Sequence, residues 1–381
     1  MNKVKLYFEP VDILNQLSAD KAEMSERQLS FLCGLIKECK PKKMVEIGVA
    51  AGGTTAVILN CINELGLKTK VYSLDLFKNY YRYHNKKTGY LIEESKRILG
   101  TRLDHTLCIG KFAVEYVKQI GEDIDFLILD TVHSLPGELL DFLAFFPLLK
   151  QGTVVVVHDI VLNHYSSNID GFATKVLLDI VAGEKFVDVD EDGSLSNIGA
   201  FVVNEDTKKY IENVFSALTI TWKYIPDNRE LEIYRENYKE NYPYEMIELF
   251  DTAVELNRRT FQKRKDNKQH EFLRIYNWID SFKEKRVYVY GCGNFGRRLY
   301  QFLSECGINL NGYIISDGQK KTENIENVYY LSEIEIDKEK DKVLIGVNDS
   351  LQEEIRAELR KREIFDYVFP DMDYIWDYLN Y

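Results

Sequence analysis

The chain has 381 residues, of which 45% are hydrophobic and 13% aromatic, and its formal net charge is −12 at pH 7. At about 150 residues per domain, this length predicts two or three domains with ordinary packed cores. Because an acidic surface repels phosphate backbones, the charge argues against nucleic acid as a partner.

No apolar segment of the sequence has the length of a signal peptide or of a membrane-spanning helix. The six cysteines form no CxxC pair, and most of them lie within apolar segments: Cys33, Cys39, Cys61, Cys108, Cys292 and Cys306. Such cysteines are typical of free thiols in a reducing compartment. We therefore expect a cytoplasmic protein without a membrane span.

The first half of the chain predicts strands that alternate with helices. Apolar residues recur at helical spacing over about 19–40, and Pro41 ends that pattern. Short apolar runs then predict buried strands, the last of them followed by a β-hairpin over 186–203 with a turn at 191–193: 44–47, 71–74, 107–109, 124–129 and 153–157. Strands that are apolar throughout and separated by helices predict a mostly parallel α/β sheet.

The character of the sequence changes twice after this hairpin. Long polar helical patterns over 205–285 predict a helical connector, which we also consider for a homo-oligomer interface. The α/β alternation restarts at Arg286, with strands expected at 287–290, 312–315 and 343–347. The sequence therefore predicts an α/β domain over 1–204, the connector, and a smaller Rossmann-like α/β domain over 286–381.

A glycine-rich turn follows the first expected strand, in the segment VEIGVAAGGTT. Gly48, Gly52 and Gly53 allow the backbone to turn sharply and to approach a ligand closely. The helix that opens at Thr54 offers free N–H groups to that ligand. Asp75 closes the next strand, where a carboxylate can accept both hydroxyls of a ribose.

The spacing of this turn is wider than the GxGxxG that seats a pyrophosphate in dinucleotide folds. S-adenosylmethionine carries no phosphate, so a roomier loop suits it, and Glu46 could then face its amine. The other interpretation is a purely structural turn between a strand and a helix.

Three segments in a fixed order carry a more specific resemblance over roughly residues 30–165. VEIGVAAGGTT, VYSLDLF and IDFLILDTVHSLPGELLDFLAFFPLLKQGTVVVVHDI together resemble class I S-adenosylmethionine-dependent methyltransferases. Within that class they resemble the group of macrocin O-methyltransferase and the cephalosporin hydroxylase-like proteins. The resemblance implies a Rossmann-like seven-stranded sheet with a terminal antiparallel hairpin. It also implies cofactor contacts at the ends of the first three strands: Glu46, Gly48 and Gly53 at the methionine part, Asp75 at the ribose, and Gly110 and Lys111 near the adenine.

Polar side chains follow the fourth and fifth expected strands. Asp130 ends the fourth strand and His133 comes three residues later, while His158 and Asp159 end the fifth. Because the carboxyl ends of parallel strands meet at one edge of a sheet, these side chains are expected to lie close together. Asp130, His158 and Asp159 could then hold a divalent cation such as Mg²⁺ that activates an acceptor hydroxyl.

His133 is the candidate general base beside Asp130, because the ordinary pKa of histidine is near neutrality. In the resembled group a histidine at this position acts as the base, and an acid stands where this chain has His158. The substitution weakens the case for Mg²⁺, which prefers oxygen ligands. His158 is otherwise interpreted as a buried structural histidine. A polar aromatic loop over 78–89 offers Tyr80, Tyr81, Tyr83 and His84 to a sugar ring, or forms an ordinary surface loop.

A second glycine turn follows the strand at Arg286, in VYVYGCGNFGRRLYQFL. Gly291, Gly293 and Gly296 have the GxGxxG spacing, and Asp317 ends the next strand, so this segment has the dinucleotide fingerprint in its proper context. It predicts a possible NAD(P) site. The other interpretation is a scaffold without a cofactor, since no histidine follows His270 to serve a dehydrogenase.

These patterns favour an S-adenosylmethionine-dependent methyltransferase that O-methylates a small hydroxylated acceptor such as a sugar. The setting would be polysaccharide or natural-product biosynthesis. Two other hypotheses stay open: an NAD(P)-dependent oxidoreductase that uses the GCGNFG fingerprint, and a non-catalytic nucleotide-binding protein.

Overall fold

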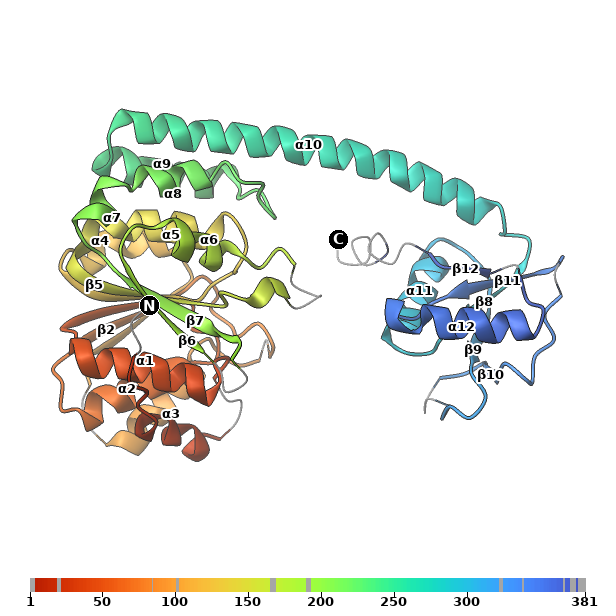
Figure 1. Cartoon of the computed structure of the whole chain (residues 1–381), viewed down its shortest axis with the longest axis horizontal. Helices are drawn as coiled ribbons and strands as arrows, with labels where there is room; N and C mark the ends of the chain where they lie inside the picture. Colours follow the sequence, from red (N-terminus) through yellow and green to blue (C-terminus); the bar gives the residue numbers. More distant parts are fainter. Residues whose placement is uncertain are drawn as a thin grey trace. The chain divides into compact units, whose positions relative to one another are not determined.

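The computed structural model describes residues 4–18, 22–83, 85–100, 103–164, 169–189, 193–321, 325–337, 339–365, 367–370 and 375. The chain divides into two compact units, Met1–Lys263 and Arg264–Tyr381 (Figure 1). Among the helices of the described residues, none is long and apolar enough to cross a membrane. None of the six cysteines forms a disulfide, and Cys39 is the exposed one among them.

A seven-stranded sheet forms the centre of the first unit, with the strand order β3-β2-β1-β4-β5-β7-β6. Its strands are β1 (Lys43–Ile47), β2 (Lys70–Asp75), β3 (His105–Ile109), β4 (Ile124–Leu129), β5 (Leu149–His158), β6 (Glu184–Val189) and β7 (Leu195–Val202). The first five are parallel, and β7 runs antiparallel to both β5 and β6. The predicted mostly parallel sheet with a terminal hairpin is therefore confirmed. Of the predicted hairpin turn, residues 191 and 192 lie outside the described residues.

Helices cover both faces of this sheet (Figure 1). On one face lie η1 (Glu9–Gln16), α1 (Glu26–Cys39), α2 (Gly53–Glu64) and α3 (Tyr90–Leu99), and toward the other face lie η2 (Ala113–Tyr116), α4 (Val117–Ile120), α5 (Gly137–Phe145), η3 (Phe146–Leu148) and α6 (Ala173–Ile180). Successive strand residues point to opposite faces, so Val45 and Leu127 enter one apolar core while Met44 and Phe126 enter the other. Burial on both faces explains why the strands are apolar throughout.

The first helix begins later than its apolar pattern suggests. The pattern starts near residue 19, but α1 starts at Glu26 because Ser25 caps it. The Ser25 hydroxyl accepts from the N–H of Gln28, and the Gln28 side chain accepts from the N–H of Ser25. This reciprocal capping box fixes the start of the helix. Residues 19–21 lie outside the described residues.

The helices that follow the sheet, with the last of them only as far as Lys263, pack on the face that carries α5. They are α7 (Glu205–Lys209), α8 (Glu212–Ala217), α9 (Asn228–Asn241) and α10 (Tyr244–Asp280). Phe215 and Phe250 are buried in the same core as α5. The Tyr238 hydroxyl donates to the carbonyl of Leu140 at 2.9 Å. The division of the chain into a domain over 1–204 and a connector over 205–285 stays a prediction, while residues up to Lys263 cluster with the first unit.

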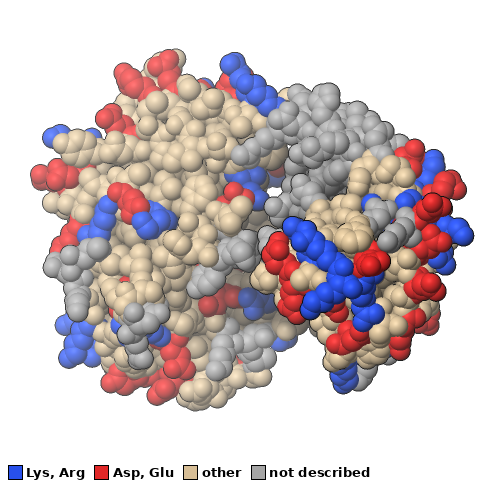
Figure 2. All heavy atoms as spheres, turned by 45° about the vertical axis from the view of Figure 1, so that its right-hand side comes forward, with Lys and Arg blue, Asp and Glu red and all other residues tan. Residues whose placement is uncertain are grey.

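The second unit has a five-stranded parallel sheet with the order β10-β9-β8-β11-β12, as expected for a second α/β domain. Its elements are β8 (Arg286–Tyr290), α11 (Asn294–Glu305), β9 (Leu310–Ile315), β10 (Val328–Tyr330), β11 (Asp341–Ile345), α12 (Asp349–Lys361) and β12 (Tyr367–Val368). Figure 2 shows acidic and basic side chains interspersed on one face of the molecule, outside the parts drawn in grey. On that face the Asp and Glu side chains do not form one continuous patch.

Candidate active site

A cavity of about 740 Å³ lies at the carboxyl ends of the parallel strands of the first unit. This is the edge at which open α/β sheets bind ligands, and the volume suits a cofactor with a small acceptor. Residues from the glycine turn, from the end of β2 and from the ends of β4 and β5 line it together: Gly48, Gly53, Thr54, Asp75, Asp130, His133 and Asp159.

The glycines of the first turn, which are predicted to bind a ligand, also have packing reasons. Gly48 has a φ of 99°, and a Cβ there would lie 1.7 Å from the carbonyl oxygen of Asp130. A Cβ on Gly53 would lie 2.8 Å from the backbone of Ala22. Only glycine therefore lets the turn pass the end of β4 and the N-terminal segment this closely. Gly52 is buried and is not among the residues that line the cavity.

The carboxylate of Asp75 braces the same turn. One of its oxygens accepts from the N–H groups of Val49 and Ala50, both at 3.1 Å, and the other accepts from Phe77 at 2.8 Å. Asp75 lines the cavity while making these bonds. The residue predicted to bind ribose therefore also holds the glycine turn against the end of β2.

Glu46 lies within β1, behind the turn, and is not among the residues that line the cavity. It accepts from the Thr55 hydroxyl at 2.7 Å, while its Oε1 has no hydrogen-bond partner among the described residues. Burial raises the pKa of this carboxyl to about 7. Its contact with the methionine part of a cofactor stays a prediction.

Gly110 and Lys111 precede the residues of their loop that line the cavity, which are Phe112 and Ala113. The Lys111 ammonium lies 5.8 Å from the centre of the Tyr116 ring. Gly110 and Lys111 are not among the residues that line the cavity, and their contact with the adenine stays a prediction.

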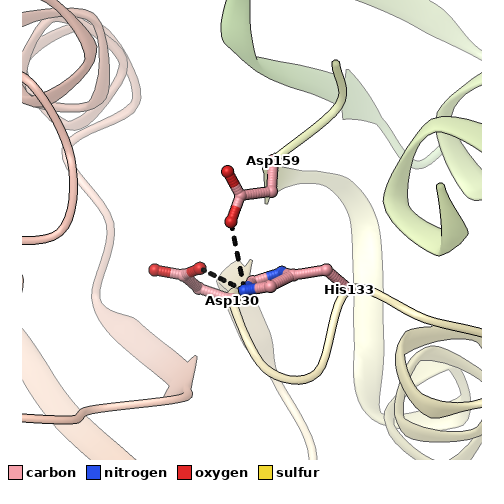
Figure 3. A group of neighbouring side chains, drawn as sticks. All are labelled: Asp130, His133 and Asp159. Atoms are coloured by element: carbon pink, nitrogen blue, oxygen red, sulfur yellow. Dashed lines mark ion pairs between the residues drawn. The ribbon is translucent and has the colours of Figure 1, made fainter. Parts of the chain in front are cut away.

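Asp130, His133 and Asp159 converge at the end of the sheet, with the imidazole between the two carboxylates (Figure 3). The His133 Nε2 lies 3.1 Å from Asp159 Oδ2 and 3.9 Å from Asp130 Oδ1. Each of the three offers one ligand atom, and these atoms lie within 4.8 Å of one another. Two oxygens and one nitrogen at this spacing form a donor set that fits a divalent cation.

Two of these three residues have left-handed backbone conformations, with φ of 58° at His133 and 60° at Asp159. Such angles are uncommon for residues other than glycine and are concentrated at functional sites. Asp159 is held further by Asn197 on β7, whose side-chain amide donates to Oδ1 and whose carbonyl accepts the Asp159 N–H at 2.9 Å.

His158 is buried beside this group, with both ring nitrogens facing oxygen atoms. Nδ1 lies 3.0 Å from Asp130 Oδ1, and Nε2 lies 3.3 Å from Oε1 of Gln28 on α1. Burial lowers the pKa of His158, but the carboxylates of Asp130 and Asp159 outweigh that effect and raise it above its ordinary value. Nδ1 of His158 also lies 3.4 Å from Asp159 Oδ2, so His133 and His158 both adjoin the two acids. The predicted ligand set of Asp130, His158 and Asp159 stays a prediction.

Glu138, near the start of α5, supports His133 and carried no recognisable signal in the sequence. It is fully buried, and its Oε1 accepts from the backbone N–H of His133 and from the Thr131 hydroxyl at 3.0 Å. The same oxygen lies 3.6 Å from His133 Nδ1. From the sequence alone, Glu138 is simply an acidic residue in the first turn of a predicted helix.

The aromatic loop after β2 forms one wall of the cavity. Tyr81 and Arg82 line it together with Glu23, and the Glu23 carboxylate accepts from the Tyr81 hydroxyl at 3.0 Å and pairs with Arg82. Tyr80 is buried and Tyr83 exposed. His84 lies outside the described residues.

The second glycine turn is closely packed at one glycine and open at another. A Cβ on Gly296 would lie 1.8 Å from the carbonyl oxygen of Gly291, whereas nothing lies within 4 Å of one on Gly293. The Asp317 carboxylate accepts from the N–H and hydroxyl of Ser332 and pairs with Arg362 at 2.6 Å. NAD(P) binding at this turn stays a prediction, and Asp317 is already engaged by these partners.

Residues 45–160 match a family model described as a methyltransferase domain. No curated protein matches the chain. Among solved structures, the S-adenosylhomocysteine-bound methyltransferase PaMTH1 of Podospora anserina is 16% identical, with 52% of this chain and 87% of that chain covered and a TM-score of 0.39. The O-methyltransferase TomG of Streptomyces achromogenes, in complex with S-adenosylmethionine, is 16% identical over 51% and 90% of the two chains, with a TM-score of 0.37.

An O-methyltransferase of Bacillus cereus in complex with S-adenosylhomocysteine is 19% identical over 51% and 90% of the two chains, with a TM-score of 0.35. At such identities and TM-scores these similarities carry no functional argument. The family match, together with the sheet and its cavity, identifies the first unit as the carrier of a methyltransferase domain, and the protein as a methyltransferase enzyme.

Proposed function

We propose that the protein is an S-adenosylmethionine-dependent O-methyltransferase that acts on a small hydroxylated acceptor such as a sugar. The observation that carries the proposal is the cavity in which the Gly48–Thr54 turn, Asp75 and the group of Asp130, His133 and Asp159 meet. The cofactor would place its methionine part on the turn and its ribose at Asp75. Its methyl group would then face the ends of β4 and β5.

Methyl transfer breaks the bond between the sulfonium sulfur and its methyl carbon and joins that carbon to the acceptor oxygen, which loses its proton. The sulfur keeps the electron pair, and S-adenosylhomocysteine leaves. The enzyme must align the two reactants and receive the proton. The residues next to the acceptor would be Asp130, His133 and Asp159, and the wall of Tyr81 and Arg82 would hold the rest of a sugar-sized molecule.

The geometry gives His133 one available nitrogen for this chemistry. Nδ1 faces buried Glu138, and Nε2 faces Asp159 and the cavity. Nε2 either takes the proton of the acceptor or completes a cation site with Asp130 and Asp159, but it does not do both at once. A bound divalent cation would lower the pKa of the acceptor hydroxyl.

The test measures methyl transfer from S-adenosylmethionine to a panel of monosaccharides and other polyols, with and without chelator. Loss of activity with chelator, restored by Mg²⁺ or Mn²⁺, would support the cation version. Activity that resists chelator but falls about 10²- to 10⁴-fold in His133→Ala would support the base version. His164→Ala is the matched control, because His164 is exposed and is not among the cavity-lining residues.

Two outcomes would overturn the proposal. One is a wild-type protein that does not bind S-adenosylhomocysteine in calorimetry. The other is transfer that is unaffected by chelator, by His133→Ala and by Asp130→Ala, because catalysis would then not depend on the group that carries the proposal.

A further inference from the structure

The cavity has a second polar end that the proposed chemistry does not use. It is formed by η2, α5 and α9, three elements that pack against one another, and by the segment before α9. The residues that line the cavity there are Phe112, Ala113, Leu140, Asp141, Tyr224, Glu230 and Tyr234. Three of them, Tyr224, Glu230 and Tyr234, lie beyond the part of the chain that matches a methyltransferase domain.

The order of the strands decides which part of a bound nucleoside would reach this end. Asp75 ends β2, whose two neighbours are β1 and β3. The group of Asp130, His133 and Asp159 lies on the β1 side, at the ends of β4 and β5, while Phe112 and Ala113 follow β3 on the other side. If the ribose lies at Asp75 and the sulfonium faces the group of Asp130, His133 and Asp159, as the proposed function requires, the base extends toward η2 and α9.

Among the residues that the structure describes, neither of the two carboxyl groups at this end, Asp141 and Glu230, has a partner of opposite charge. Asp141 is 7% exposed, and its Oδ1 accepts from the Tyr234 hydroxyl at 2.5 Å. Among the described residues, no other hydrogen bond reaches the Asp141 side chain, and neither Asp141 nor Glu230 forms an ion pair. The basic side chains that line the cavity, Arg82 and His133, have acidic partners of their own.

A buried carboxyl group with a single hydrogen-bond partner is costly, so Asp141, together with the half-buried Glu230 on the same part of the cavity wall, favours a ligand that supplies hydrogen-bond donors. Burial raises the pKa of Asp141 to about 7, and burial with the nearby Asp227 raises the pKa of Glu230 to about 7. At neutral pH such a group exists in part as the carboxylic acid, which offers one acceptor and one donor side by side. An adenine edge presents the complementary pair, an N–H donor on the exocyclic amine next to a ring-nitrogen acceptor.

We propose that Asp141 and Glu230 recognise the amino edge of the adenine of S-adenosylmethionine, with Phe112 and Ala113 against the ring. Helix α9 thereby completes the cofactor site from outside the methyltransferase domain. The inference rests on the proposed function and moves the polar adenine contacts from the predicted Gly110 and Lys111 to α5 and α9.

The test measures, on the full chain, the affinities for S-adenosylhomocysteine and for S-inosylhomocysteine, in which a carbonyl replaces the exocyclic amine. Wild type should prefer the adenine compound by about 10- to 100-fold. Glu230→Ala and Asp141→Ala should lower this ratio toward one. Glu230→Gln should keep the affinity for the adenine compound but lower the ratio, because an amide offers an acceptor and a donor to adenine and can turn to pair with hypoxanthine as well.

The ratio of two affinities in one preparation does not depend on how much of a variant is folded. Glu232→Ala is the matched control, since Glu232 is exposed on the same helix and does not line this cavity. A ratio unchanged in both alanine variants would overturn the inference. If the KM for the acceptor rose in those variants at an unchanged ratio, this end would bind the acceptor instead.

The failure of the proposed function has a different signature. A wild type that binds neither compound would overturn both the proposed function and this inference. A wild type that binds both compounds equally well would overturn this inference alone.

Discussion

Replacement of Asp75 by alanine separates two roles that the structure gives this residue. Its carboxylate holds three backbone N–H groups, those of Val49, Ala50 and Phe77, and it lines the cavity where a ribose would bind. The first role predicts a loss of stability, and the second predicts a loss of cofactor affinity. The two losses are measured independently.

The magnitudes follow from the bonds that are removed. Each of the two ribose hydroxyls that donate to the carboxylate contributes about 1.5 kcal/mol to the binding free energy, which is the lower value for a hydrogen bond to a charged group. Their loss of about 3 kcal/mol corresponds to roughly 100-fold weaker binding. The three backbone groups lie in a partly exposed turn where water can replace the carboxylate, so the free energy of unfolding should fall by about 1–3 kcal/mol in total.

Calorimetry with S-adenosylhomocysteine gives the affinity, and urea unfolding without ligand gives the stability. Asp75→Asn, which keeps one acceptor oxygen, should give intermediate values for both. Asp104→Ala is a suitable control, because Asp104 is exposed just before β3, at the opposite edge of the sheet. If Asp75→Ala lost stability but bound the ligand as tightly as wild type, Asp75 would brace the turn without binding ribose.

Four further predictions follow from the same structure. Glu138→Ala removes the buried carboxylate that accepts from the backbone N–H of His133, so the rate of methyl transfer should fall at unchanged S-adenosylhomocysteine affinity, with partial recovery in Glu138→Gln. An unchanged rate would show that Glu138 does not position His133. The folded-state pKa of Asp141 is about 7 against an ordinary value of 3.8, so the folded state holds its proton more tightly and its stability should fall as pH rises from about 4 to about 7. In urea unfolding between about pH 4 and about pH 7, Asp141→Asn should lose less stability than wild type as pH rises, and an equal loss in both proteins would contradict the raised pKa of Asp141. Gly296→Ala should destabilise the second unit without weakening S-adenosylhomocysteine binding, whereas Gly293→Ala should be tolerated, as thermal unfolding would show. Limited proteolysis should cut nearer to Lys263 than to Asn204, because α8 and α9 are packed into the first core, and a first cut near Asn204 would favour the predicted connector.

The fold could be predicted from the sequence because its signals are local. Strands apolar on both faces, separated by helical patterns, permit few arrangements other than a parallel sheet covered on two sides. The shared edge of Asp130 and Asp159 follows from the same logic, since both residues end parallel strands. The glycine turn can also be predicted, because Gly48, Gly52 and Gly53 follow the first apolar strand and precede a helical pattern. In the structure a side chain on Gly48 would collide with the backbone of Asp130.

The partners of the site residues could not be predicted, because packing between distant segments decides them. His133 and His158 look equally suitable in the sequence, yet the left-handed backbone of His133 turns it into the cavity, while Gln28 on α1 and Asp130 enclose His158. Glu138 supports His133 only because the turn that joins β4 to α5 brings the two residues together. Glu230 gained its place at the cavity because α9 packs on α5, and no periodicity within a segment records which distant segment will cover it. The sequence by itself determined the sheet and the edge that carries the site, whereas the tertiary structure decided which side chains face the cavity, because that depends on contacts between residues far apart in the chain.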